Sequence, residues 1–129
     1  MRTLIILLLF SQHYLLMDPI QKSFEDNDFS GFKNITTKQL IVNLESPLSV
    51  TGDFKREKFI ERFGNIMKYF TVEKSEWVSK HIWEDFAVQS MNLIMKNMRS
   101  GDNEYYKFIF FLKRVKGDWK LYYLRGIKL

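Results

Sequence analysis

Three long runs rich in β-branched, aromatic and long apolar residues make up the last third of the chain, at residues 86–98, 104–115 and 119–129. Short polar breaks separate them at residues 100–103 and 116–118, and each break contains a Gly-Asp pair. Glycine in such a break supplies the positive φ that a tight hairpin needs. The pattern therefore predicts three antiparallel strands that pair in order as a meander, within a strongly curved or half-buried sheet.

Residues 54–70 carry the strongest helix pattern of the chain. Their apolar side chains recur at the spacing of one helix face. These side chains are Phe59, Phe63, Ile66, Met67 and Phe70. We expect Asp53 to begin this helix, because a carboxylate there faces the free N–H groups of the first turn.

The remaining elements are shorter. Asp18-Pro19 and apolar residues at spacing four predict a helix over about residues 19–27, followed by a helical turn or packed loop at 29–37. Alternating residues 39–45 predict a strand. Residues 71–82 alternate with few apolar members and predict an exposed or edge strand, and residues 83–85 predict a turn into the meander.

This order of elements predicts an α+β fold, with helices packed on a strongly curved, mainly antiparallel sheet that ends in a three-stranded meander. At 129 residues the chain fits one domain, which we place at residues 18–129.

The order and length resemble the nuclear transport factor 2-like (cystatin-like cone) superfamily and, more narrowly, a small bacterial family of exported proteins of unknown function. The resemblance rests on residues 20–28, the 40–44 strand, the 54–70 helix and residues 106–121, where a Lys-Gly-Asp turn precedes Trp-Lys-Leu. It covers about residues 18–129 and implies a fold much more than a function.

The first 17 residues have the shape of a signal peptide. Arg2 precedes seven apolar residues at 4–10, a run far shorter than the ~20 residues of a membrane-spanning helix, so we expect no integral span. The segment lacks a clear cleavage site. Export to the periplasm or medium is the favoured prediction, and a cytoplasmic protein that starts at Met17 is the alternative.

Composition narrows the chemistry further. The chain has no Cys, which excludes disulfides, thiolate metal sites and a Cys nucleophile. Its net charge of +5 is modest and its cations are scattered, so we expect no nucleic-acid partner. Only two His are present, and His13 lies in the leader, so we expect no metal and no cofactor.

In a cone of this kind the curved sheet and the long helix enclose a pocket. Apolar residues that could line it for an adaptable apolar ligand alternate along the helix and two strands. They are Phe63, Met67, Met91, Leu93, Met95, Phe108 and Phe110. The competing interpretation is a packed core, because Met and Phe stripes fill cores more often than they form pockets.

Enzymes of the resembled superfamily place a carboxylate base or a His–Asp pair in that pocket, with a Tyr donor opposite. Here the acid–base candidates are His81 with Asp85 or Glu73, and a phenol from Tyr106, Tyr105 or Tyr122. None of them stands at a recognisable motif spacing.

We therefore expect a non-enzymatic domain that binds a small apolar ligand or a protein partner. The alternative is an isomerase-, dehydratase- or hydrolase-like enzyme that uses His81 with a carboxylate. A homodimer through the sheet is a further prediction, because the expected outward faces of the last strands are apolar enough to need covering. Those positions are Tyr105, Ile109, Phe111, Leu121 and Tyr123.

Overall fold

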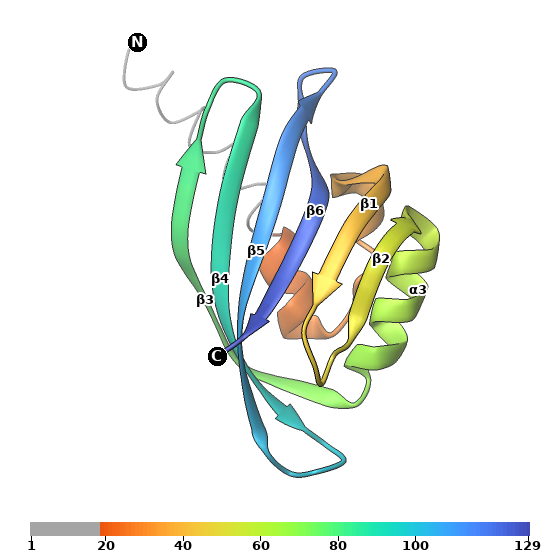
Figure 1. Cartoon of the computed structure of the whole chain (residues 1–129), viewed down its shortest axis with the longest axis vertical. Helices are drawn as coiled ribbons and strands as arrows, with labels where there is room; N and C mark the ends of the chain where they lie inside the picture. The colour runs from red at the N-terminus through yellow and green to blue at the C-terminus, as the bar shows by residue number, and fades with distance from the viewer. Residues whose placement is uncertain (1–18) are drawn as a thin grey trace.

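A computed structural model describes residues 19–129 as helices packed against a six-stranded sheet (Figure 1). The predicted leader, residues 1–17, lies outside the described residues. Residues 19–26 are helical. The later elements are α2 (Phe32–Ile35), β1 (Thr36–Leu44), β2 (Val50–Lys55), α3 (Arg56–Met67), β3 (Phe70–Ile82), β4 (Phe86–Asn97), β5 (Asn103–Val115) and β6 (Asp118–Lys128). No helix among residues 19–129 is long and apolar enough to cross a membrane.

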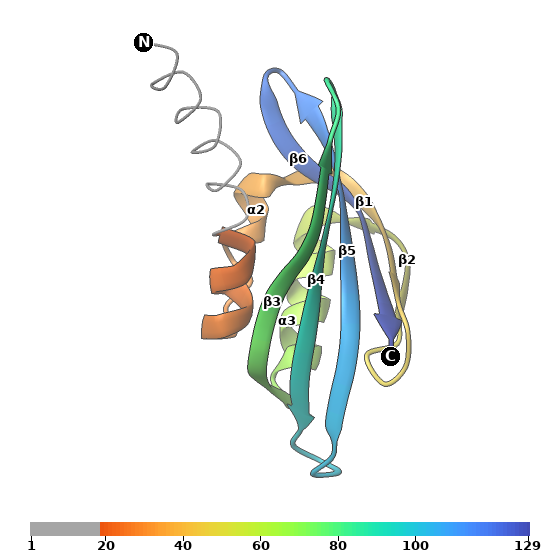
Figure 2. The same ribbon diagram turned by 90° about the vertical axis from the view of Figure 1, so that its left-hand side faces the viewer.

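The strands lie in the order β2-β1-β6-β5-β4-β3. Every neighbouring pair is antiparallel except β1 and β6, which are parallel. The predicted meander of the last three strands is confirmed, and β3 lies at the sheet edge as expected. Figure 2 shows the helical segment 19–26 and α2 on one side of the bent sheet. The predicted α+β class is thus confirmed.

The helix start was predicted wrongly, and β2 was missed. Asp53 lies inside β2, opposite Ile41, and α3 begins only at Arg56 with no side-chain cap. The residues before the helix alternate, so that Val50 and Phe54 face the same side of the sheet as their partners on β1. Pairing with β1 therefore keeps this segment extended, although Gly52-Asp53 alone indicates a break.

The core lies between α3 and the inner sheet face, the face that the helices cover. Phe59, Phe63 and Met67 are fully buried along α3. The Phe63 ring lies 6.4 Å from Phe108 and 6.1 Å from Phe24, centre to centre. Burial of side chains of this size stabilises the fold by roughly 1.5–3 kcal/mol each.

A bulge in β6 changes which of its side chains face the core. Phe111 lies opposite Tyr123, whereas the next residue, Leu112, lies opposite Leu121, so Tyr122 is an extra residue. Leu121 is consequently buried on the inner face, and its predicted outward position was wrong. Tyr122 and Tyr123 both face outward as a result.

Candidate functional site

The first three acid–base candidates, His81, Asp85 and Tyr106, do not share one pocket. His81 is exposed near the end of β3, where its ring stacks on Trp83 at 6.3 Å. Asp85 is exposed in the β3–β4 turn, and its carbonyl accepts a hydrogen bond from the Arg114 N–H at 3.1 Å. Through its partner on β4, His81 lies on the face of the sheet that is turned away from the helices.

Tyr106 lies on the inner face and is fully buried. Its hydroxyl donates a hydrogen bond to the Glu45 carbonyl at 2.7 Å and accepts one from the Leu48 N–H at 3.2 Å. Burial raises the pKa of Tyr106 to about 12, because it disfavours the phenolate, and the nearby carboxylates act in the same direction. This phenol stays protonated and holds the β1–β2 loop.

His81 and Tyr106 are far apart. His81 pairs with Val88 on β4, and Tyr106 pairs with Leu93 on the same strand. The positions differ by five residues, or about 16 Å along a strand, and the two side chains point to opposite faces. The structure therefore keeps His81 and Tyr106 apart; Glu73 is exposed on β3, and Tyr105 and Tyr122 lie on the same face as His81. No group of three metal-ligating side chains occurs within residues 19–129.

The seven predicted pocket residues do come together, as part of one buried core. Each has at most 1% of its surface exposed. They are Phe63, Met67, Met91, Leu93, Met95, Phe108 and Phe110. Aromatic rings occupy the space between α3 and the sheet, with Phe24 only 5.4 Å from Phe108 and 6.5 Å from Phe110. The Met and Phe stripes therefore pack as part of the hydrophobic core.

The opposite face of the sheet carries an apolar surface, which we call the outer sheet face. Strand register places ten apolar side chains on it. They are Ile41, Phe86, Val88, Ile94, Tyr105, Ile109, Phe111, Tyr122, Tyr123 and Ile127. Ile41 and Tyr105 each expose 47% of their surface. The ten residues lie on the four inner strands of the sheet, β1, β6, β5 and β4.

Aromatic rings cross this face from strand to strand. Trp83 stacks on Phe86 at 5.3 Å, and Phe86 lies 6.3 Å from Tyr122. Beyond the bulge, Tyr123 meets Phe111 edge-on at 4.9 Å. Four of the rings project from β4, β5 and β6, and Trp83 joins them from the turn after β3.

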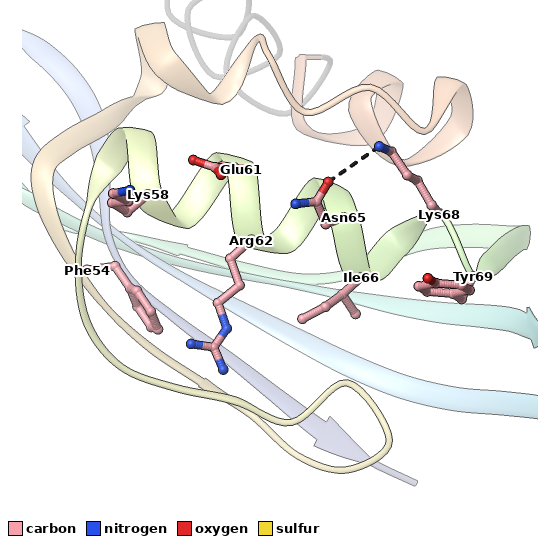
Figure 3. Close-up of a pocket in the computed structure, with 8 residues that line it drawn as sticks. All are labelled: Phe54, Lys58, Glu61, Arg62, Asn65, Ile66, Lys68 and Tyr69. Carbon is pink, nitrogen blue, oxygen red and sulfur yellow. Dashed lines mark hydrogen bonds between the residues drawn. The ribbon is translucent and has the colours of Figure 1, made fainter.

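A second surface feature lies between α3 and β2, and we call it the α3–β2 groove. It has a volume of about 810 Å³. Eight residues line it: Phe54, Lys58, Glu61, Arg62, Asn65, Ile66, Lys68 and Tyr69. Figure 3 shows Phe54, Arg62 and Ile66 pointing into the space between the helix and the β1–β2 hairpin. Three of the eight are cations and one is an anion.

Sequence comparison gives no relative: no protein-family model and no curated protein matches the chain. Comparison with solved structures finds many proteins of similar fold. The chain superposes on a DUF4783 family protein from Bacteroides uniformis with a TM-score of 0.73 at 7% identity, over 87% of this chain and 95% of that one. An NTF2-like protein from Cytophaga hutchinsonii gives a TM-score of 0.66 at 15% identity, over 92% and 98%.

The chain has the nuclear transport factor 2-like fold. A DUF4783 family protein from Bacteroides ovatus, with a TM-score of 0.69 at 10% identity over 84% and 90% of the two chains, agrees. The predicted likeness to this superfamily and to a small family of unknown function is confirmed. At such low identity the likeness establishes the nuclear transport factor 2-like fold alone.

Proposed function

We propose that this nuclear transport factor 2-like domain is a non-enzymatic interaction module and that its outer sheet face binds a second copy of the chain. The observation that carries the proposal is the row of outward apolar side chains across the sheet, of which Ile41 and Tyr105 are each 47% exposed. An apolar surface of this extent marks an interaction site on a soluble protein.

The size of the face suits a dimer. Its apolar side chains lie on four neighbouring strands, β1, β6, β5 and β4, which at about 4.8 Å spacing and about 11 residues in length span roughly 14 Å by 36 Å, or about 520 Å². A standard stable interface buries about 800 Å² on each partner. The apolar part of the face therefore supplies about two-thirds of that area, and the outward polar side chains of β2 and β3 form the rest of the contact.

Charge also permits self-association. Lys107 and Arg125 lie on the central strands of this face, whereas Asp53 and Glu76 lie on its outer strands. Glu76 has an exposed 3.7 Å ion pair with Lys74, so Asp53 is the acid that a two-fold related copy, offset across the strands, would set against Lys107 or Arg125.

A protein partner is favoured over a small apolar ligand because rings and thioethers fill the space between α3 and the sheet. It is favoured over an acid–base enzyme because His81, Asp85 and Glu73 are exposed, whereas Tyr106, the one buried member of the candidate set, lies on the opposite face from His81. Both reasons favour a binding site on the surface of the domain.

The test is sedimentation equilibrium of the full chain over about 1–100 µM, the range in which a moderate dimer dissociates. Ile41→Glu removes a half-exposed apolar side chain from each copy and buries a charge. We expect the dimer dissociation constant to rise about 30-fold or more, since each copy loses about 1 kcal/mol of apolar burial. Met98→Glu is the matched control, because Met98 is 59% exposed in the turn after β4 and lies off the face.

A wild-type chain that remains monomeric throughout this range would overturn the proposal. Equal weakening by Met98→Glu and Ile41→Glu would also overturn it, because the effect would then come from charge alone and not from the outer sheet face.

Export is a separate proposal, based on the charged and apolar pattern of residues 1–17. Intact-mass measurement of the protein recovered from the producing cells tests it. Loss of the leader supports export, and a cytoplasmic chain that begins at Met17 rejects it.

A further inference from the structure

The α3–β2 groove runs along a free edge of the sheet. β2 pairs only with β1, so the backbone groups on its other side are unpaired within the sheet. Figure 1 shows α3 beside β2 on the side away from β1, and the groove lies between the two elements. An extended peptide that pairs with such an edge obtains a ladder of main-chain hydrogen bonds.

The floor of the groove is apolar. Phe54 and Ile66 are half-buried along it, and Tyr69 at its far end is 46% exposed. The groove continues past Ile66 and Tyr69 into a smaller hollow of about 270 Å³ next to Arg99. The Arg99 guanidinium lies over the Tyr69 ring at 3.7 Å, which fixes the ring in place.

The rim of the groove is basic. Lys58, Arg62 and Lys68 are exposed, and none of the three makes an ion pair within residues 19–129. Arg62 reaches over the Phe54 ring at 5.6 Å, and Lys68 donates only to the Asn65 amide oxygen at 3.4 Å. The single acid, Glu61, leaves an excess of positive charge that attracts carboxylates.

The two faces of β2 differ in what they meet: the inward side faces the basic residues of α3, whereas the outward side carries one acid, Asp53, and one base, Lys55. Phe54 and the groove lie on its inner side, whereas Asp53 faces outward beside Ile41. An added strand alternates its side chains in the same way as β2. It is therefore favoured when its acidic and apolar residues share the inner set of positions and its outer set is uncharged.

We propose that the α3–β2 groove binds an extended acidic peptide, which adds to the edge of β2 with its acidic side chains facing Lys58 and Arg62. The site is independent of the outer sheet face. A peptide is favoured over a nucleic acid because the strand edge offers backbone pairing and because Arg99 already covers one face of Tyr69, which leaves less of that ring for a base to stack on.

The experiment measures binding of fluorescent eight-residue peptides to the full chain by anisotropy. In the test peptide, Glu and Val occupy one set of alternate positions and Thr occupies the other. A control peptide has the same residues with Glu and Val spread over both sets, and a second control carries N-methyl groups on alternate amides. We expect the test peptide to bind at least about tenfold more tightly than either control.

Charge reversal locates the site. The double variant Lys58→Glu and Arg62→Glu should bind the test peptide about tenfold or more weakly, because two attractions become repulsions. Lys116→Glu changes charge in the exposed β5–β6 turn outside the groove, and its affinity should stay within about twofold of wild type. All these positions are exposed, so the variants should fold.

Three results would overturn the proposal. Equal binding of the shuffled or N-methylated peptide would exclude strand addition. Unchanged binding by the double variant would place the peptide elsewhere. Tighter binding of an eight-nucleotide single strand than of the test peptide would make the groove a phosphate site.

Discussion

Replacement of Gly126 by Ala tests how closely β6 packs against the core. Gly126 is buried on the inner face, between Leu44 on β1 and Phe108 on β5. A Cβ atom there would lie 2.8 Å from Leu44 Cδ2 and 2.9 Å from Phe108 Cε1. Carbon atoms in favourable contact are about 3.5–4.0 Å apart, so both neighbours would have to move.

Neither neighbour can move freely. Leu44 is 1% exposed, and the Phe108 ring is enclosed by Phe24 at 5.4 Å and Tyr106 at 5.7 Å. Overpacking of this kind costs about 1–3 kcal/mol. The restriction that Ala places on the unfolded chain offsets about 0.4–1 kcal/mol of this. We expect the free energy of unfolding to fall by about 1–2 kcal/mol.

Gly64 provides the matched control, because the same substitution has the opposite effect there. It lies in the middle of α3, and an added Cβ would meet nothing within 4 Å. Ala is about 0.8–1 kcal/mol better than Gly inside a helix, so Gly64→Ala should raise the free energy of unfolding by roughly 0.5–1 kcal/mol.

Urea denaturation at one fixed protein concentration measures both variants, since self-association would add a concentration-dependent term. The two midpoints should move in opposite directions, with the denaturant slope unchanged. If Gly126→Ala is as stable as wild type, the close packing of β6 against Leu44 and Phe108 is refuted.

Further predictions concern polar groups. Tyr106→Phe leaves the Leu48 N–H without its acceptor and should cost about 1–3 kcal/mol by denaturation at pH 7. In the wild-type protein the folded pKa of Tyr106 is raised to about 12. The free energy of unfolding that Tyr106 contributes is therefore full below about pH 10 and falls by about 2–3 kcal/mol as the pH rises towards 12. The Tyr106→Phe variant should lack this pH dependence. Lys128→Met strands the 8%-exposed Glu104, whose carboxylate lies 2.8 Å from the ammonium, and should cost about 1–3 kcal/mol. Lys74→Met breaks an exposed pair and should change stability by less than about 0.5 kcal/mol, so equal losses would contradict the burial argument.

The sequence predicts well those elements whose pattern is long and local. The meander strands and α3 each carry many regularly spaced apolar residues, and their turns contain Gly101 and Gly117 with φ of 80° and 86°. β2 escapes prediction because it has only six residues and Gly52 takes one of its inward positions. Its extended form depends on pairing with β1, a tertiary effect that outweighs local preference.

The sites were harder to predict than the fold. One extra residue at Tyr122 reverses the facing of Leu121, and alternation alone gives no sign of it. His81 and Asp85 are close in sequence and were candidates for one acid–base site in the interior pocket, but both are exposed. The groove did leave a trace, because Lys58, Arg62, Ile66 and Tyr69 follow one another at spacings of four, four and three along the helix. That stripe resembles any solvated face until β2 is placed beside it.

The parallel pairing of β1 with β6 has a consequence for synthesis of the chain. β1 and β2 form the first hairpin, but the only other strand beside β1 is β6, the last strand in chain order. A nascent chain can therefore pair β3, β4 and β5 with one another while the first hairpin still lacks a neighbouring strand. We expect ribosome-bound chains that stop before β6 to remain sensitive to protease in β1 and β2, and to become resistant in one step when β6 has emerged.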